Sequence, residues 1–280
     1  MNDGLWPSDC NRFVPPLLPA SCFFDFMLLP FVVAGAVALI AYLARTLTVT
    51  GAFAATFVGG AAMIGGVRWV VMLLFFFVTS SALSLWRARE RNRLVGSLLE
   101  KGGRRDAWQV LAYGGVFAVA ALASTSADTL TWHAVGIGAI ATSTTDTWST
   151  EVGTVLGGTP IDILSGRQVP PGTSGGITIA GTATAVAAAI LAAMVASMVV
   201  WNTPAFAIVI GGLVGSLTDS LLGSTVQERR WCPSCDVATE RRTHSCGTTT
   251  VHRGGIRGCD NDIVNLLSTV AGAVVTWTLV

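Results

Sequence analysis

Charge is what this sequence has least of. Only 12% of its 280 residues are Asp, Glu, Lys or Arg, whereas soluble domains have about 25%. So small a charged fraction cannot cover a soluble globular enzyme, and it also excludes a disordered chain and a basic nucleic-acid binder. With 52% hydrophobic residues and a mean hydropathy of +0.63, the composition predicts an all-α polytopic membrane protein.

The few charges separate stretches that are apolar enough to cross a bilayer. A spanning helix needs about 20 such residues. We therefore expect about eight transmembrane helices, over residues 27–44, 46–67, 69–86, 107–127, 129–145, 177–201, 204–222 and 263–280. The second, which is rich in glycine, and the fifth are the weakest. Either could be re-entrant, which leaves the count at seven or eight.

The basic residues predict how the chain is oriented. In an eight-span arrangement every Lys and Arg except Arg12 and Arg68 falls on one side. Basic loops mark the cytoplasmic side of a cell membrane, so both termini are expected outside. Residues 1–26, rich in Pro and Asp, are expected to be a disordered tail, or an upstream start to a chain that truly begins at Met27. Residues 27–280 then form a single integral membrane domain.

The first polar cluster follows the fifth stretch. Asp146 and Glu151 lie in a run of Thr and Ser, and Arg167 precedes the loop Gly172-Thr173-Ser174-Gly175-Gly176. Backbone N–H groups of such a loop can converge on an anion, and a helix N-terminus after it also favours phosphate. Arg167 would add a bidentate contact. The alternative is a flexible loop with ordinary turn chemistry.

The second cluster is a stripe of small residues. Gly211, Gly215, Asp219 and Gly223 repeat every four residues, so they share one helix face. Small residues let another helix approach closely. Asp219, beside Ser220, is therefore expected to face protein. The alternative is glycines used only for packing, with an interfacial Asp.

The third cluster begins the last stretch, with Asp260, Asn261, Asp262 and Asn265. Helix capping explains Asp260 or Asn261, but not Asn265, one turn deeper. Four acids thus gather at one membrane face: Asp146, Glu151, Asp219 and Asp262. Mg²⁺ binds through carboxylates and substrate phosphates, so a metal–nucleotide site is expected. A coupling-ion site in a transporter also fits.

The cytoplasmic loop 225–259 holds most of the cysteines. Its pattern favours a small zinc knuckle, since tetrahedral Zn²⁺ takes sulfur and nitrogen ligands. The expected ligands of this structural Zn²⁺ are Cys232, Cys235, His244 and Cys246, with His252 and Cys259 as substitutes. Reduced free thiols are the alternative.

Two further features have a simpler interpretation. The basic loop 87–106 is expected to bind anionic lipid headgroups, and a share in substrate phosphate binding is the sharper alternative. His133, near an outer span end, is expected to be a packing or interfacial residue.

Seven short motifs together resemble one membrane family, designated domain of unknown function 92. It includes transmembrane protein 19 and plant phytyl-phosphate kinase, and it is similar to CTP-dependent polyprenol kinases. The resemblance runs from about Leu39 to the C-terminus. Tyr113 departs from the family's pattern, which has Asn there. The motifs are residues 47–52, 76–84, 109–115, 146–151, 169–176, 219–223 and 261–265.

The resemblance implies an enzyme, a Mg²⁺-dependent kinase acting on an isoprenyl-phosphate lipid in the membrane. A nucleoside triphosphate, CTP or ATP, would convert phytyl, geranylgeranyl or farnesyl phosphate to the diphosphate. Asp146, Glu151 and Asp219 would bind the metal or orient the acceptor. The remaining residues would hold nucleotide phosphates or complete the site: Arg167, Gly172, Thr173, Ser174, Gly175, Gly176, Ser220, Asn261, Asp262 and Asn265. The alternatives are a CTP-dependent cytidylyltransferase that makes a CDP-lipid, and a transporter or lipid translocase. No nucleic-acid partner is expected.

Overall fold

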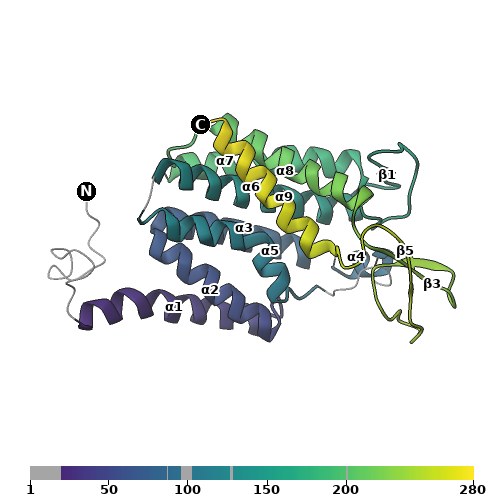
Figure 1. The fold of residues 1–280 in the computed structure, drawn as a ribbon, viewed down its shortest axis with the longest axis horizontal. Helices are drawn as coiled ribbons and strands as arrows, with labels where there is room; N and C mark the ends of the chain where they lie inside the picture. Colours follow the sequence, from purple (N-terminus) through teal and green to yellow (C-terminus); the bar gives the residue numbers. More distant parts are fainter. Residues whose placement is uncertain (1–19, 87, 96–102, 127–128, 200) are drawn as a thin grey trace.

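The computed structural model describes residues 20–86, 88–95, 103–126, 129–199 and 201–280, and it is mostly helical (Figure 1). Residues 1–19 of the expected tail lie outside the described residues, as do Arg87 and Lys101. Residues 20–26, assigned above to that tail, belong to the first helix. The helices are α1 (Ala20–Leu43), α2 (Val49–Gly65), α3 (Val67–Leu85), α4 (Ala88–Val95), α5 (Ala107–Ala123), α6 (Thr129–Leu156), α7 (Ile179–Met198), α8 (Ala205–Thr225) and α9 (Asn261–Thr278).

The long helices follow the expected apolar stretches. In the described part of the chain, α3, α7 and α8 are long and apolar enough to cross a membrane, and Leu28–Leu43, α2 and α5 are apolar but shorter. The count of seven or eight spans therefore stays a prediction. The two weakest candidates, α2 and α6, are each one continuous helix.

Helix α6 is longer than expected, because it ends at Leu156 and not near residue 145. Its hydroxyl groups do not break it. Thr142 and Thr144 donate to the carbonyls of Gly138 and Ile140 at 2.9 and 2.8 Å, one turn back in the same helix. The helix stops where Gly158 adopts a φ of +68°. Asp146 and Glu151 are therefore helical residues, and not loop residues.

The fold is mostly helical, as expected, and its loops also contain short strands that were not predicted. Two short strands, β1 (Ile161–Asp162) and β2 (Gly176–Ile177), pair antiparallel. A second antiparallel sheet, in the order β4-β3-β5, contains β3 (Arg229–Cys232), β4 (Val237–Thr239) and β5 (Val251–Gly254). Polar loops need partners for their backbone groups, and these ladders supply them.

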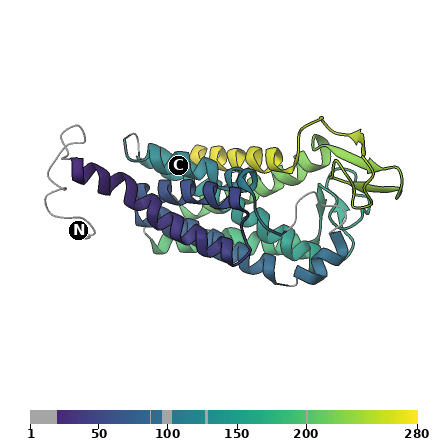
Figure 2. The ribbon, with the colours of Figure 1, turned by 90° about the horizontal axis from the view of Figure 1, so that it is seen from below.

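The strands all lie at one end of the molecule, and the C-terminus and the start of α1 lie at the other (Figures 1 and 2). Helix α6 packs against α3, α5, α7, α8 and α9. The expected stripe of small residues on α8 is confirmed as a packing face. A Cβ at Gly211 would collide with Thr276 of α9, and a Cβ at Gly215 with Thr142 of α6. Close backbone contact therefore holds α6, α8 and α9 together.

An aromatic core lies away from the strands, near the starts of α3 and α6. His133 is buried there, with its ring 5.6 Å from Trp69 and 5.2 Å from Trp201. The indole of Trp201 donates to the His133 carbonyl at 3.1 Å. The expectation that His133 packs is confirmed, and the polar residues that remain gather at the opposite end.

Candidate functional site

Two cavities adjoin each other at the strand-bearing end. The arginine cavity, of about 620 Å³, is lined by Arg91, Arg105, Arg230, Arg241 and Arg242 together with acids and amides. The glycine-loop cavity, of about 530 Å³, lies between α6, α7, α8 and residues 171–178. The cavities share six lining residues: Arg91, Thr150, Glu151, Gln227, Glu240 and Asn261.

A pair of carboxyl groups lines the glycine-loop cavity. Asp146 of α6 and Asp219 of α8 lie close enough for their charges to interact. The phenol of Tyr113 donates to Asp146 Oδ2 at 3.2 Å. Asp219 Oδ1 is buried and, among the described residues, has no hydrogen-bond partner. Two adjacent acids with an unsatisfied oxygen fit a divalent cation, because it would offset their repulsion.

Glu151 has a different partner from the one expected. Both of its carboxylate oxygens accept from Nη1 of Arg91, at 2.6 and 2.7 Å, and Ser84 Oγ donates to Oε1 at 2.6 Å. Both charged side chains are mostly buried. In this arrangement Glu151 fixes Arg91 where the two cavities meet, and its role as a Mg²⁺ ligand stays a prediction.

The glycine loop lines its cavity as expected, but part of its backbone is already bonded. The N–H groups of Thr173 and Gly176 donate to the carbonyls of Pro170 and Thr173, at 3.2 and 2.9 Å. Positive φ values at Gly172 and Gly175 shape the turn. Ser174 Oγ donates to Glu240 at 3.1 Å. The structure thus places the loop at the cavity, but fewer of its backbone N–H groups than expected are available to bind an anion.

Two of the expected residues lie elsewhere. Arg167 is exposed on the turn between β1 and β2 and lines neither cavity. Asn265 is 1% exposed, and its amide nitrogen has no partner within the described structure, but it also lines neither cavity. The turn that carries Arg167 is held by Asp162. Its carboxylate accepts from Ser224 at 2.6 Å and from Ser165, and these hydrogen bonds lower the pKa of Asp162 to about 2.

The start of α9 is divided between capping and the cavities. Asp260 caps the helix, because its Oδ1 accepts from the N–H groups of Asp262 and Ile263 at 3.1 Å. Asn261 lines both cavities, Asp262 lines the arginine cavity, and Ser220 of α8 lines the glycine-loop cavity. Capping therefore explains Asp260 alone, and the two residues after it face the site.

Some arginines that line the cavities were not among the site residues expected from the sequence. The loop 87–106 was expected to bind lipid headgroups, yet Arg91 and Arg105 line the arginine cavity. Burial lowers the pKa of Arg105, while the nearby Tyr113 and Glu151 raise it. Its neighbour Arg104 instead donates to the Leu47 carbonyl at 2.7 and 3.0 Å. The signal in the sequence was the position of Arg105, four residues before the start of the 109–115 motif.

An apolar cavity of about 260 Å³ lies between α1, α2, α3 and α5. Its walls are apolar side chains, except for Arg105, Gln109 and Tyr113. These three residues also line the arginine cavity. The two cavities therefore meet at a guanidinium, an amide and a phenol, which are groups that bind phosphate oxygens.

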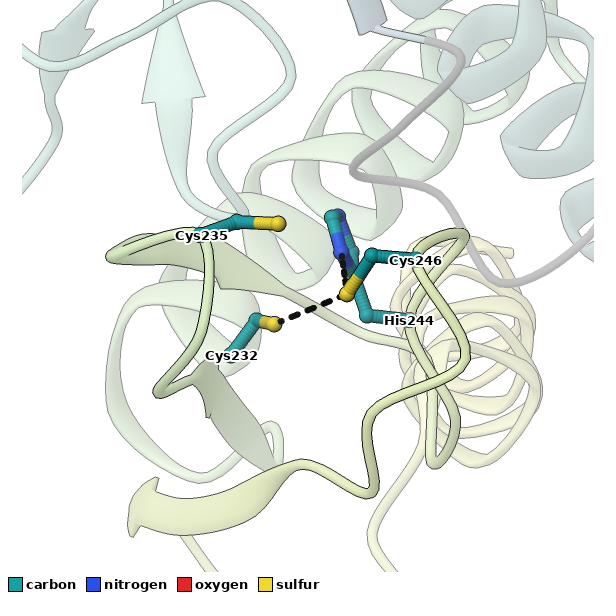
Figure 3. A group of neighbouring side chains, drawn as sticks. All are labelled: Cys232, Cys235, His244 and Cys246. Atoms are coloured by element: carbon teal, nitrogen blue, oxygen red, sulfur yellow. Dashed lines mark hydrogen bonds between the residues drawn. The ribbon is translucent and has the colours of Figure 1, made fainter.

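The loop 225–259 brings its expected metal ligands together (Figure 3). The ligand atoms of Cys232, Cys235, His244 and Cys246 all lie within 4.8 Å of one another. The two expected substitutes, His252 and Cys259, are not part of this group. His252 Nε2 lies 3.2 Å from the Gly255 carbonyl.

Most of this sequence is similar to known proteins. Residues 32–273 match a family model described as "Integral membrane protein DUF92". Protein PGR of Arabidopsis thaliana is 28% identical over 272 residues, which cover 88% of this chain and 93% of that protein. An uncharacterized membrane protein of Methanocaldococcus jannaschii is 26% identical over 220 residues, 75% of each chain. No solved structure matches.

Proposed function

Because the chain belongs to the DUF92 family of integral membrane proteins, we propose that it is an isoprenyl-phosphate kinase. It would transfer the γ-phosphoryl group of a nucleoside triphosphate to a prenyl monophosphate and release the nucleoside diphosphate. The new P–O bond forms on an oxygen of the acceptor phosphate, and the bond between the β–γ bridging oxygen and the γ-phosphorus breaks.

One observation carries this proposal, namely that Arg105, Gln109 and Tyr113 line both an apolar and a polar cavity. A substrate with an apolar chain and an anionic head would occupy both spaces. Its chain would lie between α1, α2, α3 and α5. Its phosphate would lie beside Arg105 and Arg91, which the bond to Glu151 holds in place.

The donor nucleotide fits the other side of the site. The glycine-loop cavity provides residues 172–176, Ser220 and Asn261 around a polyphosphate, and Arg241 and Arg242 lie in the adjoining arginine cavity. Asp146 and Asp219 would hold Mg²⁺, which offsets phosphate charge when bound. Phosphoryl transfer depends mainly on positioning and charge neutralisation, and these are what the residues around both cavities can supply.

The test is a transfer assay on the full chain, purified in detergent. CTP or ATP labelled at the γ-phosphate is supplied with Mg²⁺ and phytyl, geranylgeranyl or farnesyl phosphate. We expect labelled prenyl diphosphate and unlabelled nucleoside diphosphate, neither product without lipid, and far less of both with Asp219→Asn. Absence of transfer for every nucleotide and lipid would overturn the proposal.

The products separate the alternatives in the same reaction. A cytidylyltransferase would release labelled pyrophosphate and retain the nucleotide's α-phosphate on the lipid. A transporter would instead give flux of prenyl phosphate in proteoliposomes without nucleotide. Either result replaces the kinase assignment.

A further inference from the structure

The three-stranded sheet of loop 225–259, here called the cysteine module, has almost no hydrophobic core. Its buried residues are mainly polar, and within the described structure Cys232 is its one fully buried hydrophobic side chain. Its strands are only three or four residues long. So small a sheet needs a hydrophobic face or a cross-link to persist.

A disulfide does not supply that cross-link in the structure described, where the cysteines of the module are free. The sulfur atoms of Cys232 and Cys246 are 3.6 Å apart. That separation is too long for an S–S bond of about 2 Å. It is close to the roughly 3.8 Å between two thiolates on one tetrahedral Zn²⁺, given a Zn–S distance of about 2.3 Å.

Two tight turns place the four ligand atoms opposite each other. After β3 the chain turns back at Asp236, whose φ is +55° and whose N–H donates to the Cys232 carbonyl at 3.0 Å. The second turn closes when Gly247, with a φ of +85°, donates to the His244 carbonyl at 2.9 Å. His244 Nδ1 lies 3.3 Å from Cys246 Sγ (Figure 3). The hydroxyls of Thr248 and Ser234 join the turns at 2.9 Å.

The module also forms one wall of the arginine cavity. Arg241 and Arg242 lie between the two ligand turns and line that cavity, as does Arg230 of β3. The carbonyls of Arg241 and Arg242 both accept from Thr250 Oγ1, at 2.6 and 3.0 Å. The guanidinium of Arg230 donates to Thr250 at 2.8 and 2.9 Å. The segment 236–243 is thus anchored at both ends by the ligand turns.

We propose that Cys232, Cys235, His244 and Cys246 bind one Zn²⁺, which holds segment 236–243 so that Arg241 and Arg242 face the arginine cavity. The metal is structural, because four protein ligands complete its tetrahedral coordination. It links a module without a core to a site on the helical bundle. The proposal does not depend on the kinase assignment, since it concerns metal binding and the position of a loop.

The first test is the zinc content of the full chain, purified in detergent without chelators. We expect about one Zn²⁺ per chain, as for a closed structural site, and its loss in Cys232→Ser and Cys246→Ser. Cys259→Ser is the matched control and keeps the metal. Wild-type protein without zinc overturns the proposal, and so does equal loss from Cys259→Ser.

A second readout uses only the wild-type protein, so it does not depend on whether the variants fold. Wild-type protein, stripped of metal and given Co²⁺, should show the visible bands of tetrahedral Co²⁺ and a thiolate-to-metal charge-transfer band. A spectrum of octahedral Co²⁺ without thiolate bands would contradict the ligand set.

The positioning role is tested with trypsin, which cleaves after arginine. Chelation should speed cleavage at Arg241 and Arg242 by about tenfold or more, because an anchored segment resists local opening. Cleavage at Arg167, on an exposed turn, should not change. Equal rates at Arg241 and Arg242 with and without metal would overturn the positioning role, even if zinc is bound.

Discussion

The helical bundle and the cysteine module both line the site, and they are held together in different ways. The bundle carries Asp146 and Asp219 on helices that glycines bring into backbone contact. The module carries Arg230, Arg241 and Arg242 on a sheet with almost no core. Packing fixes the acids of the bundle, whereas we propose that a bound Zn²⁺ holds the arginines of the module in place.

The largest effect is expected from the acids of the bundle. Asp219→Asn keeps the size of the side chain and removes its charge, so kcat/KM for phosphoryl transfer should fall about 10²- to 10³-fold, the range for loss of one preorganised electrostatic group. Asp236→Asn, on the exposed turn of the module, should leave the rate unchanged. Steady-state kinetics check both. Similar rates for the two variants would remove Asp219 from the site.

The packing of the bundle is tested next, by adding one methyl group. Gly211→Ala should reduce the free energy of unfolding by about 1–3 kcal/mol, as overpacking does, because its Cβ would meet Thr276 and the Gly272 carbonyl. Gly115→Ala is the matched control, since no atom lies near its Cβ position. Thermal unfolding in detergent, followed by the monodisperse fraction, compares them. An equal shift for both would show that backbone contact is not what holds α8 to α9.

A third prediction separates the two neighbouring arginines. Arg105→Gln should raise KM for the prenyl phosphate about tenfold, equivalent to about 1.4 kcal/mol, because Arg105 lies where the apolar and arginine cavities meet. Arg104→Gln loses the bonds to the Leu47 carbonyl and the contact with the Tyr42 ring, and it should leave that KM unchanged because Arg104 lines neither cavity. The KM of each variant, measured for prenyl phosphates of different chain lengths, distinguishes the two arginines. A larger effect from Arg104 would contradict the placement of the lipid head.

The smallest effect is expected from Tyr113→Phe. This change removes one hydrogen bond to Asp146 and keeps the ring, so kcat should fall by less than about tenfold, within the roughly 0.5–1.5 kcal/mol of such a bond. Tyr113→Asn, the residue of the family's pattern, should retain the bonding group and lose the ring. If Phe and Asn variants both match the wild type in kcat and in KM for lipid, Tyr113 has no part in positioning.

Local patterns predicted much of the fold. Uncharged stretches located the long helices, and the four-residue spacing of Gly211, Gly215 and Asp219 correctly gave one packed face. The end of α6 was misplaced, because the uncharged stretch ends before Asp146, whereas the helix continues past both acids to Leu156. Loop 225–259 was expected to hold a zinc knuckle, but its strands were not predicted, because they depend on pairings that no short window contains.

The site was predictable where its residues cluster along the chain. The acids, the glycine loop and the four ligands of the cysteine module were all named from spacing, and the structure brings the ligands together. Arg105 and Tyr113 were not identified from spacing, because their importance comes from lining two cavities at once. Arg167 was expected at the site for its position beside the glycine loop, yet the β1–β2 turn directs it outward.

The sequence by itself determined that this is a membrane protein with scarce charges at defined positions, because hydropathy and helical periodicity are local properties of a chain. Only the tertiary structure decided which charges share a cavity. Glu151 is bonded to Arg91 across 60 residues, and Asp146 lies against Asp219 from another helix. Such contacts depend on which helix faces pack together, and packing is settled by the shape of the whole bundle.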